Sequence, residues 1–196
     1  MPRTFGLWLL SGIPGILLGM GIAGCAGNSL GQNFKFGAEP KPSVSDARMV
    51  DVPFFPDKTD QCGPSALASV LSFWGRAVEP AVLKKEIYLA HLKGSLPIDL
   101  MLAAKSRGFE ARLYSGSIDD LKSELGKGHP LVAYINRGFN LLPIGHYVVV
   151  CGYDEGRQGL FVHSGLSKDR FISYRSFLRS WNKTQRLTLL ILPPAP

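Results

Sequence analysis

The chain has 196 residues, of which 45% are hydrophobic, and 22 basic and 15 acidic side chains give it a formal net charge of +7. This length and apolar content suffice for one domain with a buried core and exclude a chain that is disordered throughout. Its basic residues are scattered and no nucleic-acid recognition motif is present, so we expect no nucleic-acid partner. The absence of a Gly-rich phosphate loop gives no support to nucleotide use.

Residues 1–24 have the pattern of a secretory signal peptide. Arg3 provides a short positive start, residues 5–24 are apolar or small, and residues 22–25 read Ile-Ala-Gly-Cys. This ending resembles a bacterial lipobox, which implies that Cys25 receives a lipid and becomes the first residue of the mature chain. An uncleaved membrane helix is the alternative, but the glycine and proline residues within the run make it a poor one.

Lipid attachment with more than one acyl chain at Cys25 would hold the protein stably on a membrane. Ala26 follows it, where an aspartate would favour retention in the inner membrane, so the resemblance favours the outer membrane of a Gram-negative envelope, facing the periplasm. Residues 25–49 contain Gly, Ser, Asn, Lys and Pro without a clear period and are expected to form a tether. The folded domain is expected over residues 50–192, followed by a short tail at 193–196.

A lone cysteine stands at the start of a predicted helix in residues 60–71, which read Asp-Gln-Cys-Gly-Pro-Ser-Ala-Leu-Ala-Ser-Val-Leu. Pro64 suits a first turn, and apolar residues at spacings of three and four through Trp74 predict a helix that packs on the core and ends near Gly75. A helix N-terminus favours the thiolate, so we expect a lowered pKa for Cys62. A buried cysteine with only a packing role is the alternative, but its apolar neighbours begin only after the following glycine and proline.

Residues 52–56 read Val-Pro-Phe-Phe-Pro, and after a short polar loop residues 61–68 read Gln-Cys-Gly-Pro-Ser-Ala-Leu-Ala. These stretches resemble the nucleophile region of the bacteriocin-processing, double-glycine type of cysteine peptidases, which belong to the papain-like superfamily. The resemblance covers about residues 50–192 and is greatest to the stand-alone periplasmic lipoprotein branch. It implies a papain-like α+β fold, in which a nucleophile helix packs on an antiparallel sheet.

Helices and strands are predicted along the rest of the domain from apolar periodicity and from stop signals. Helices are expected over residues 80–89, 97–105, 117–125 and 174–181, and strands over residues 109–114, 131–135, 146–154, 159–165 and 186–192. Residues 136–145 are expected to form a loop with exposed apolar residues, which either lines a substrate groove or packs on the core.

The second candidate site residue is His146, which opens the apolar run at residues 145–154. A cysteine nucleophile needs a base that takes the thiol proton and later protonates the leaving amine. A histidine at a strand start is more often structural, but the resemblance implies that His146 matches the catalytic histidine of the family. Cys151, within the same strand, is expected to be an inert core residue, and no disulfide between Cys62 and Cys151 is expected because a catalytic thiol stays free.

Two positions depart from the family pattern. The family usually has an aspartate about seventeen residues after the histidine to orient the imidazole, and His163 stands there instead. A neutral histidine would accept a hydrogen bond from His146 and set its tautomer, but it would add no negative charge, so weaker activity is expected. Asp169 and Asn182 are less favoured substitutes for this role.

The second departure concerns the oxyanion. The family commonly places a glutamine about five or six residues before the cysteine, and its amide helps the backbone N–H to bind the developing charge. Pro56 and Asp57 stand there, and an ionised Asp57 would repel an oxyanion. Gln61 is the only nearby side-chain amide and is therefore the oxyanion candidate, although its offset of one residue from Cys62 favours a different direction.

The leading hypothesis is therefore a membrane-anchored periplasmic cysteine peptidase that hydrolyses a peptide bond through a thioester. The alternative is a catalytically weak or inactive peptidase-like module that binds a peptide or an envelope partner; an amidase or a transpeptidase would use the same thioester chemistry. We expect a monomer with a peptide or protein substrate, no cofactor and no metal, since the histidines and cysteines lack metal-ligand spacing. A double-glycine leader is the best-known substrate of the family, but that specificity accompanies export transporters.

Overall fold

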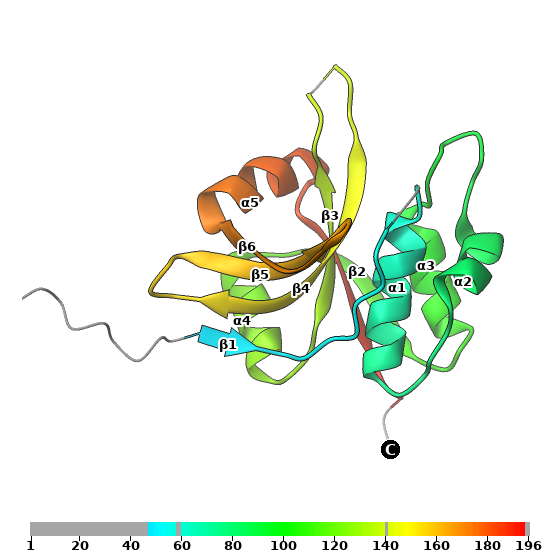
Figure 1. The fold of residues 1–196 in the computed structure, drawn as a ribbon, viewed down its shortest axis with the longest axis horizontal. Coiled ribbons are helices and arrows are strands. Elements are labelled where there is room, and N and C mark those ends of the chain that lie inside the picture. Colours follow the sequence, from blue (N-terminus) through cyan, green and yellow to red (C-terminus); the bar gives the residue numbers. More distant parts are fainter. Residues whose placement is uncertain (1–46, 58–59, 140, 195–196) are drawn as a thin grey trace, which may run out of the picture. The chain divides into compact units, whose positions relative to one another are not determined.

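The computed structural model describes residues 47–57, 60–139 and 141–194, which form a single antiparallel sheet with helices packed against it (Figure 1). Its helices are α1 (Cys62–Phe73), α2 (Pro80–Ile87), α3 (Pro97–Lys105), α4 (Ile118–Gly126), α5 (Tyr174–Trp181) and the short 3-10 helix η1 (Asn182–Thr184). Its strands are β1 (Ala47–Met49), β2 (Glu110–Ser115), β3 (Leu131–Asn136), β4 (Gly145–Asp154), β5 (Gly159–Ser164), β6 (Ser167–Ser173) and β7 (Leu187–Leu192).

Strand β4 pairs with more strands than any other strand of the described sheet. The strand order is β2-β7-β3-β4-β5-β6, and β1 pairs with the far end of β4, so that β4 has three strand partners. Its run of valines is buried on both faces, which explains why this sequence is apolar without alternation. The register places Ile135 of β3 opposite His146, at the end of β4 that lies nearest the β3–β4 hairpin.

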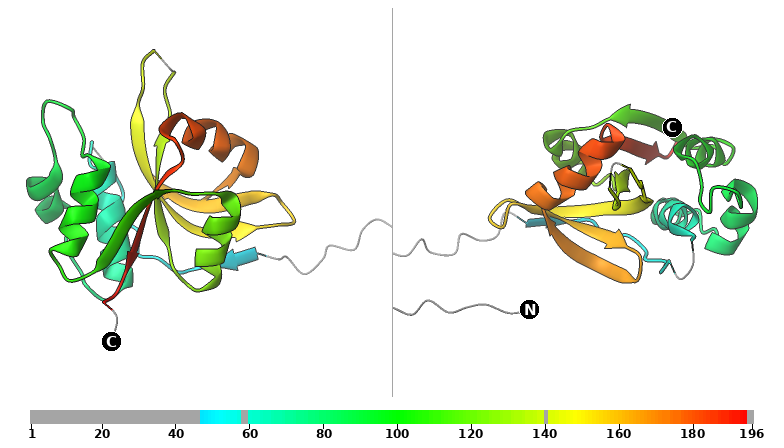
Figure 2. Two further views of the ribbon diagram at one scale, coloured as in Figure 1. Left: turned by 180° about the vertical axis from the view of Figure 1, so that it is seen from behind. Right: turned by 90° about the horizontal axis from the view of Figure 1, so that it is seen from above.

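Helices α1, α2 and α3 lie together beside the sheet, whereas α5 lies against β3, β5 and β6 (Figures 1 and 2). Of the first three, α1 packs most closely on β4, and its buried face includes Leu67 and Leu71, which have no exposed surface. The helix ends as the sequence predicts, because Gly75 adopts a φ of 81°, a conformation that glycine adopts without steric cost. The start of α1 lies near the first residues of β4, at one end of the strands.

The predicted α+β class is confirmed, as are the predicted helices and strands, within a few residues at their ends. Strand β6 was missing from the prediction because its first residues, Ser-Lys-Asp-Arg, are polar. It forms nevertheless, because it is an edge strand that pairs with β5 and has its other edge free of strand partners within the described sheet.

The N-terminal boundary of the domain lies earlier than the predicted residue 50. Residues 47–49, which the sequence assigned to the tether, form β1 and pair with residues 152–154 of β4. The predicted signal peptide, Cys25 and the rest of the tether lie outside the described residues. Within the described part of the chain, no helix combines the length and the apolar character that crossing a bilayer requires.

The loop between β3 and β4 does not pack on the core. Phe139 is 79% exposed, Leu141 93% and Leu142 72%, and the hairpin that carries them extends away from the sheet (Figure 1). The base of the hairpin is held by Asn136, whose side-chain oxygen accepts hydrogen bonds from the backbone N–H groups of Gly138 (2.8 Å) and Ile144 (2.9 Å). Of the two roles expected for this loop, the packing role is excluded.

Candidate active site

Helix α1 places Cys62 as its first residue, where the thiol is half-buried at the edge of the sheet. The preceding loop returns to this helix start, because Asp57 Oδ1 accepts a hydrogen bond of 2.9 Å from the backbone N–H of Gln61. The first N–H groups of a helix lack intrahelical acceptors, and a carboxylate is favoured beside them. Asp57 therefore has a structural reason to lie next to the cysteine.

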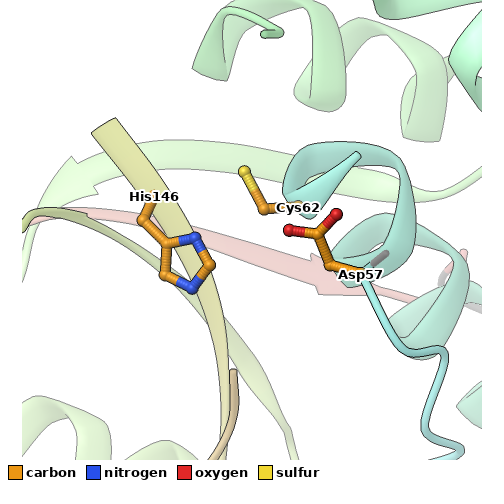
Figure 3. A group of neighbouring side chains, drawn as sticks. All are labelled: Asp57, Cys62 and His146. Atoms are coloured by element: carbon orange, nitrogen blue, oxygen red, sulfur yellow. The ribbon is translucent and has the colours of Figure 1, made fainter. Parts of the chain in front are cut away.

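Strand β4 places His146 opposite this helix start. One carboxylate oxygen of Asp57, the Cys62 sulfur and one ring nitrogen of His146 all lie within 4.8 Å of one another. Figure 3 shows that Nδ1, the ring nitrogen next to the attachment carbon, is the one that faces the Cys62 sulfur, with the Asp57 carboxylate beside both groups. Residues 84 positions apart in the sequence thus bring a thiol and an imidazole together, which is the arrangement that the sequence hypothesis requires.

The thiol of Cys62 is not activated in the way that the sequence suggested. Burial raises its pKa, and the nearby Asp57 carboxylate raises it further. Backbone N–H groups of Tyr147, Gly63 and Cys62 itself act in the opposite direction, but the pKa remains above its ordinary value. The expectation of a lowered pKa is therefore wrong, because desolvation and a like charge outweigh the helix N-terminus.

The imidazole of His146 is also held in its neutral form. Burial lowers its pKa to about 4, the Arg137 guanidinium contributes to the lowering, and Asp57 opposes it. Near neutral pH the resting pair is consequently a thiol and a neutral imidazole. A nucleophilic attack by such a pair would need general-base catalysis, in which the proton moves as the sulfur attacks, because no preformed thiolate–imidazolium ion pair is present.

The group that orients His146 is Ser164, at the end of β5. The distance between His146 Nε2 and Ser164 Oγ is 3.0 Å, on the opposite side of the ring from the thiol. If Nδ1 is to accept the thiol proton, the neutral ring must carry its hydrogen on Nε2, which then donates to the serine oxygen. Ser164 therefore sets the tautomer without supplying negative charge.

His163 does not occupy the position expected of it. Its Nε2 lies 2.9 Å from the backbone oxygen of Val52, and its Nδ1 accepts a hydrogen bond of 3.2 Å from the backbone N–H of Asp169. Both ring nitrogens are thus engaged away from His146, and the ring holds the segment before α1 against β5, where Phe54 contacts it edge-on. Adjacent residues of a strand point to opposite faces, so a shift of one residue replaces His163 by Ser164.

Of the two less favoured substitutes, Asp169 belongs to the surroundings of His163, with a distance of 3.5 Å between its Oδ1 and the histidine Nδ1, and Asn182 begins η1. Gln61 is the N-cap residue of α1, and its backbone N–H, not its amide, makes the hydrogen bond to Asp57. Asp57 is the side chain that lies beside the thiol. The oxyanion role of Gln61 stays a prediction.

Cys151 is fully buried, as predicted, and both it and Cys62 are free thiols. Its Sγ donates to the backbone oxygen of Phe161 (3.2 Å), and burial raises its pKa well above the ordinary value. With His163 and Asp169 it forms a second group whose donor atoms lie within 4.8 Å of one another. The atoms in each of the two groups of three are close enough together to bind a metal ion. The sequence did not reveal either group, because its three residues come from separate segments of the chain.

The hydrogen bond to Ser164 has a measurable consequence. In Ser164→Asp we expect the pKa of His146 to rise, because a carboxylate beside Nε2 favours the imidazolium. In Ser164→Ala we expect the rate of Cys62 alkylation at pH 7 to fall by about tenfold, because the ring loses the partner that sets its tautomer. NMR titration of the His146 ring and the pH profile of alkylation measure these effects.

Ser167→Ala, at the exposed start of β6, is the matched control for this pair of variants. If the titration of His146 is unchanged in Ser164→Asp and the control behaves as the native protein, Ser164 is not the residue that orients His146.

A thiol at the N-terminus of a helix, with an imidazole on the adjoining antiparallel strand, defines the papain-like class of cysteine-peptidase fold. The model of the Peptidase_C39 like family matches residues 49–189, which is more than half of the chain. The protein belongs to this family. A comparison with proteins of curated function found no match.

Solved structures share the fold. The chain is similar to a double glycine motif protease from an AMS/PCAT transporter in complex with the leader peptide, with 22% identity, a TM-score of 0.60 and coverage of 74% of this chain and 94% of that one. The peptidase domain of Streptococcus ComA, a bi-functional ABC transporter, has 25% identity and a TM-score of 0.59, over 74% of this chain and 98% of that one. A C39-like peptidase from Bacillus anthracis has 18% identity and a TM-score of 0.62, over 77% and 100%.

Proposed function

We propose that the protein is a cysteine peptidase in which Cys62 is the nucleophile and His146 the general base. The observation that carries the proposal is the placement of the His146 ring between two groups. Its Nδ1 faces the Cys62 sulfur, and its Nε2 lies 3.0 Å from Ser164 Oγ. The family assignment supports it, as do similar proteins whose names describe peptidases, one of them in complex with a leader peptide.

The reaction follows from the neutral resting pair. As the Cys62 sulfur attacks a peptide carbonyl carbon, its proton passes to His146 Nδ1 and the carbonyl oxygen becomes an oxyanion near the N–H groups at the start of α1. The protonated imidazole then gives its proton to the leaving amine, which departs and leaves a thioester on Cys62. His146 next accepts a proton from a water that attacks the thioester, and this proton returns to the sulfur as the carboxylic acid product leaves.

A cavity adjoining Cys62, lined also by Asp57 and Ser65, has a volume of only about 20 Å³. This is room for about one water molecule, so a peptide would lie across the surface above the thiol and not inside the domain. Phe139, Leu141 and Leu142 on the β3–β4 hairpin are exposed close to His146 in the chain and are available to line such a surface.

A weak or inactive module that binds a peptide or an envelope partner is the second candidate. Asp57 is the observation that favours it, because its charge raises the pKa of the Cys62 thiol and would oppose an oxyanion formed there. The two candidates share the binding surface and differ in turnover alone.

A peptide pool distinguishes the two candidates. The full chain is incubated with random-sequence decapeptides, and new N-termini are identified by mass spectrometry, with Cys62→Ala as the matched control. A peptidase generates new N-termini that are absent with Cys62→Ala. Cleavage that persists in Cys62→Ala would come from another source, and a native protein that retains peptides without cutting any would be the binding module.

We further propose that Cys25 is lipidated and that residues 25–46 tether the domain to the periplasmic face of the outer membrane. The support is the resemblance of residues 22–25 to a lipobox and the polar, unpatterned sequence that follows. Labelling of cells with a radioactive fatty acid is expected to mark the native protein and not Cys25→Ser. Equal labelling of the two would exclude this anchor.

A further inference from the structure

A second, larger pocket adjoins the site on the side of His146 away from the thiol. It has a volume of about 330 Å³ and lies between β6 and α5, with Ser164 on its wall. Part of its lining is apolar, from Ile135 and Phe177, and part is polar. The pocket therefore shares with the candidate active site the residue that orients the base.

The polar part of this pocket is positively charged. Arg137 and Arg170 line it, and none of its lining residues in the described part of the chain is an aspartate or a glutamate. Neither guanidinium forms an ion pair within residues 47–57, 60–139 and 141–194. Two arginines that border one pocket without a carboxylate partner present a ready site for a bidentate oxyanion such as a carboxylate.

The start of α5 strengthens this character. Ser173 is the N-cap of the helix and Ser176 lies in its first turn, and both line the pocket. The backbone N–H groups of Tyr174 and Ser176 already donate to the Gln158 oxygen (2.8 Å) and to Ser173 Oγ (3.4 Å), and the Ser173 hydroxyl donates to Ser176 Oγ (3.1 Å). The helix dipole and the Ser176 hydroxyl are what this helix start offers to an anion. Arg170 lies on β6, Ser176 lies on α5 and Arg137 directly follows β3. All three nevertheless line the same pocket.

The position of the pocket indicates which part of a peptide it would meet. His146 faces Cys62 through Nδ1 and Ser164 through Nε2, so the pocket lies beyond the imidazole as seen from the sulfur. The amine that leaves in peptide hydrolysis takes its proton from this imidazole. The residues that follow the cleaved bond therefore lie on the side of His146, toward the arginines.

We propose that this pocket binds a carboxylate in the part of the peptide that follows the cleaved bond, either an acidic side chain or the free C-terminus. The inference rests on the proposed function for the direction of the peptide, whereas the anion site itself depends only on the pocket. It gives the protein a preference for acidic peptides, or for bonds near a C-terminus, that the thiol and the imidazole alone would not supply.

The test uses the full chain as Cys62→Ala, which retains peptides without turnover. Random decapeptides are synthesised with a free C-terminal carboxylate and, separately, with a C-terminal amide, and retained peptides are identified by mass spectrometry. We expect about tenfold enrichment of peptides with Asp or Glu, or of free-carboxylate over amide peptides, because charge-assisted hydrogen bonds are the strong ones. The two pools distinguish a side-chain carboxylate from a terminal one.

Replacing both pocket arginines, by Arg137→Gln and Arg170→Gln, is expected to abolish the enrichment. The matched control replaces Arg175→Gln and Arg179→Gln, which are exposed on α5 and do not line the pocket. The control carries the same change of charge and is expected to keep the enrichment. Equal loss in both pairs would indicate unspecific attraction to the basic surface and would overturn the proposal.

Cleavage of the same pools by the native protein gives the direction. We expect acidic residues, or the free terminus, after the cleaved bond; acidic residues only before it would overturn the placement. A native protein that binds acidic peptides through these arginines but cuts none would contradict the proposed function and leave the anion site standing. Binding to phosphatidylglycerol vesicles that depends on Arg137 and Arg170, without any preference among peptides, would assign the pocket to a membrane surface and overturn the inference.

Discussion

Asp57→Asn is expected to increase the rate of Cys62 alkylation by iodoacetamide at pH 7 several-fold. The Asp57 carboxylate raises the pKa of the thiol, so its removal lowers that pKa and increases the fraction present as thiolate. Asparagine keeps an oxygen that can accept the hydrogen bond from the Gln61 N–H, which preserves the start of α1. The midpoint of the alkylation rate against pH is expected to move to lower pH.

The change acts on the thiol and not through the base. Asp57 raises the pKa of His146, so its removal lowers a value that is already about 4, and the imidazole stays neutral at pH 7 in either protein. Cys62→Ala is the labelling control, since Cys151 is buried and should not react. An unchanged or higher midpoint in Asp57→Asn would show that burial alone sets the pKa of the thiol.

The same variant is expected to raise peptide turnover, because it also removes a negative charge from the region in which the oxyanion forms. Asp57→Gln restores a side-chain amide near the position at which the resemblance places one. An increase in alkylation without any gain in turnover would favour the binding module over the peptidase.

His146→Ala is expected to reduce kcat/KM for peptide cleavage by about a thousandfold. The magnitude is typical of the loss of a positioned general base. A thiol with a raised pKa is almost entirely protonated at pH 7, so no preformed thiolate is present to react without the base. Added imidazole should restore part of the activity, and the exposed His91→Ala variant should behave as the native protein.

The pH dependence provides a second measurement of the same residue. The imidazole acts as a base only when it is neutral, so native activity should be lost as the pH falls through about 4, the pKa that burial imposes on His146. This acidic limit should be missing from His146→Ala, whose residual reaction should rise only at alkaline pH. If the native protein and His146→Ala had the same dependence of the Cys62 alkylation rate on pH, a catalytic role for His146 would be contradicted.

Local patterns in the sequence were sufficient to place the two candidate reacting groups, Cys62 and His146, at the ends of their elements. The apolar spacing after Cys62 predicted α1 with the thiol at its start, and the run after His146 predicted a central strand with the imidazole at its edge. Both depend on residues that are neighbours along the chain, which is why periodicity and helix signals reveal them. The family resemblance rested on the same stretches, and the match over residues 49–189 confirms the family, whereas the lipoprotein branch stays a prediction.

Long-range packing decided the remaining parts of the site. Ser164, not His163, meets His146, because the register of β4 and β5 and the alternation of their side chains select one of two adjacent residues. The sign of the Cys62 pKa shift was wrong from sequence, since desolvation depends on how deeply α1 and its preceding loop are buried. Arg137 and Arg170 border one pocket only after the strands have paired, because residues so far apart become neighbours through tertiary contacts alone.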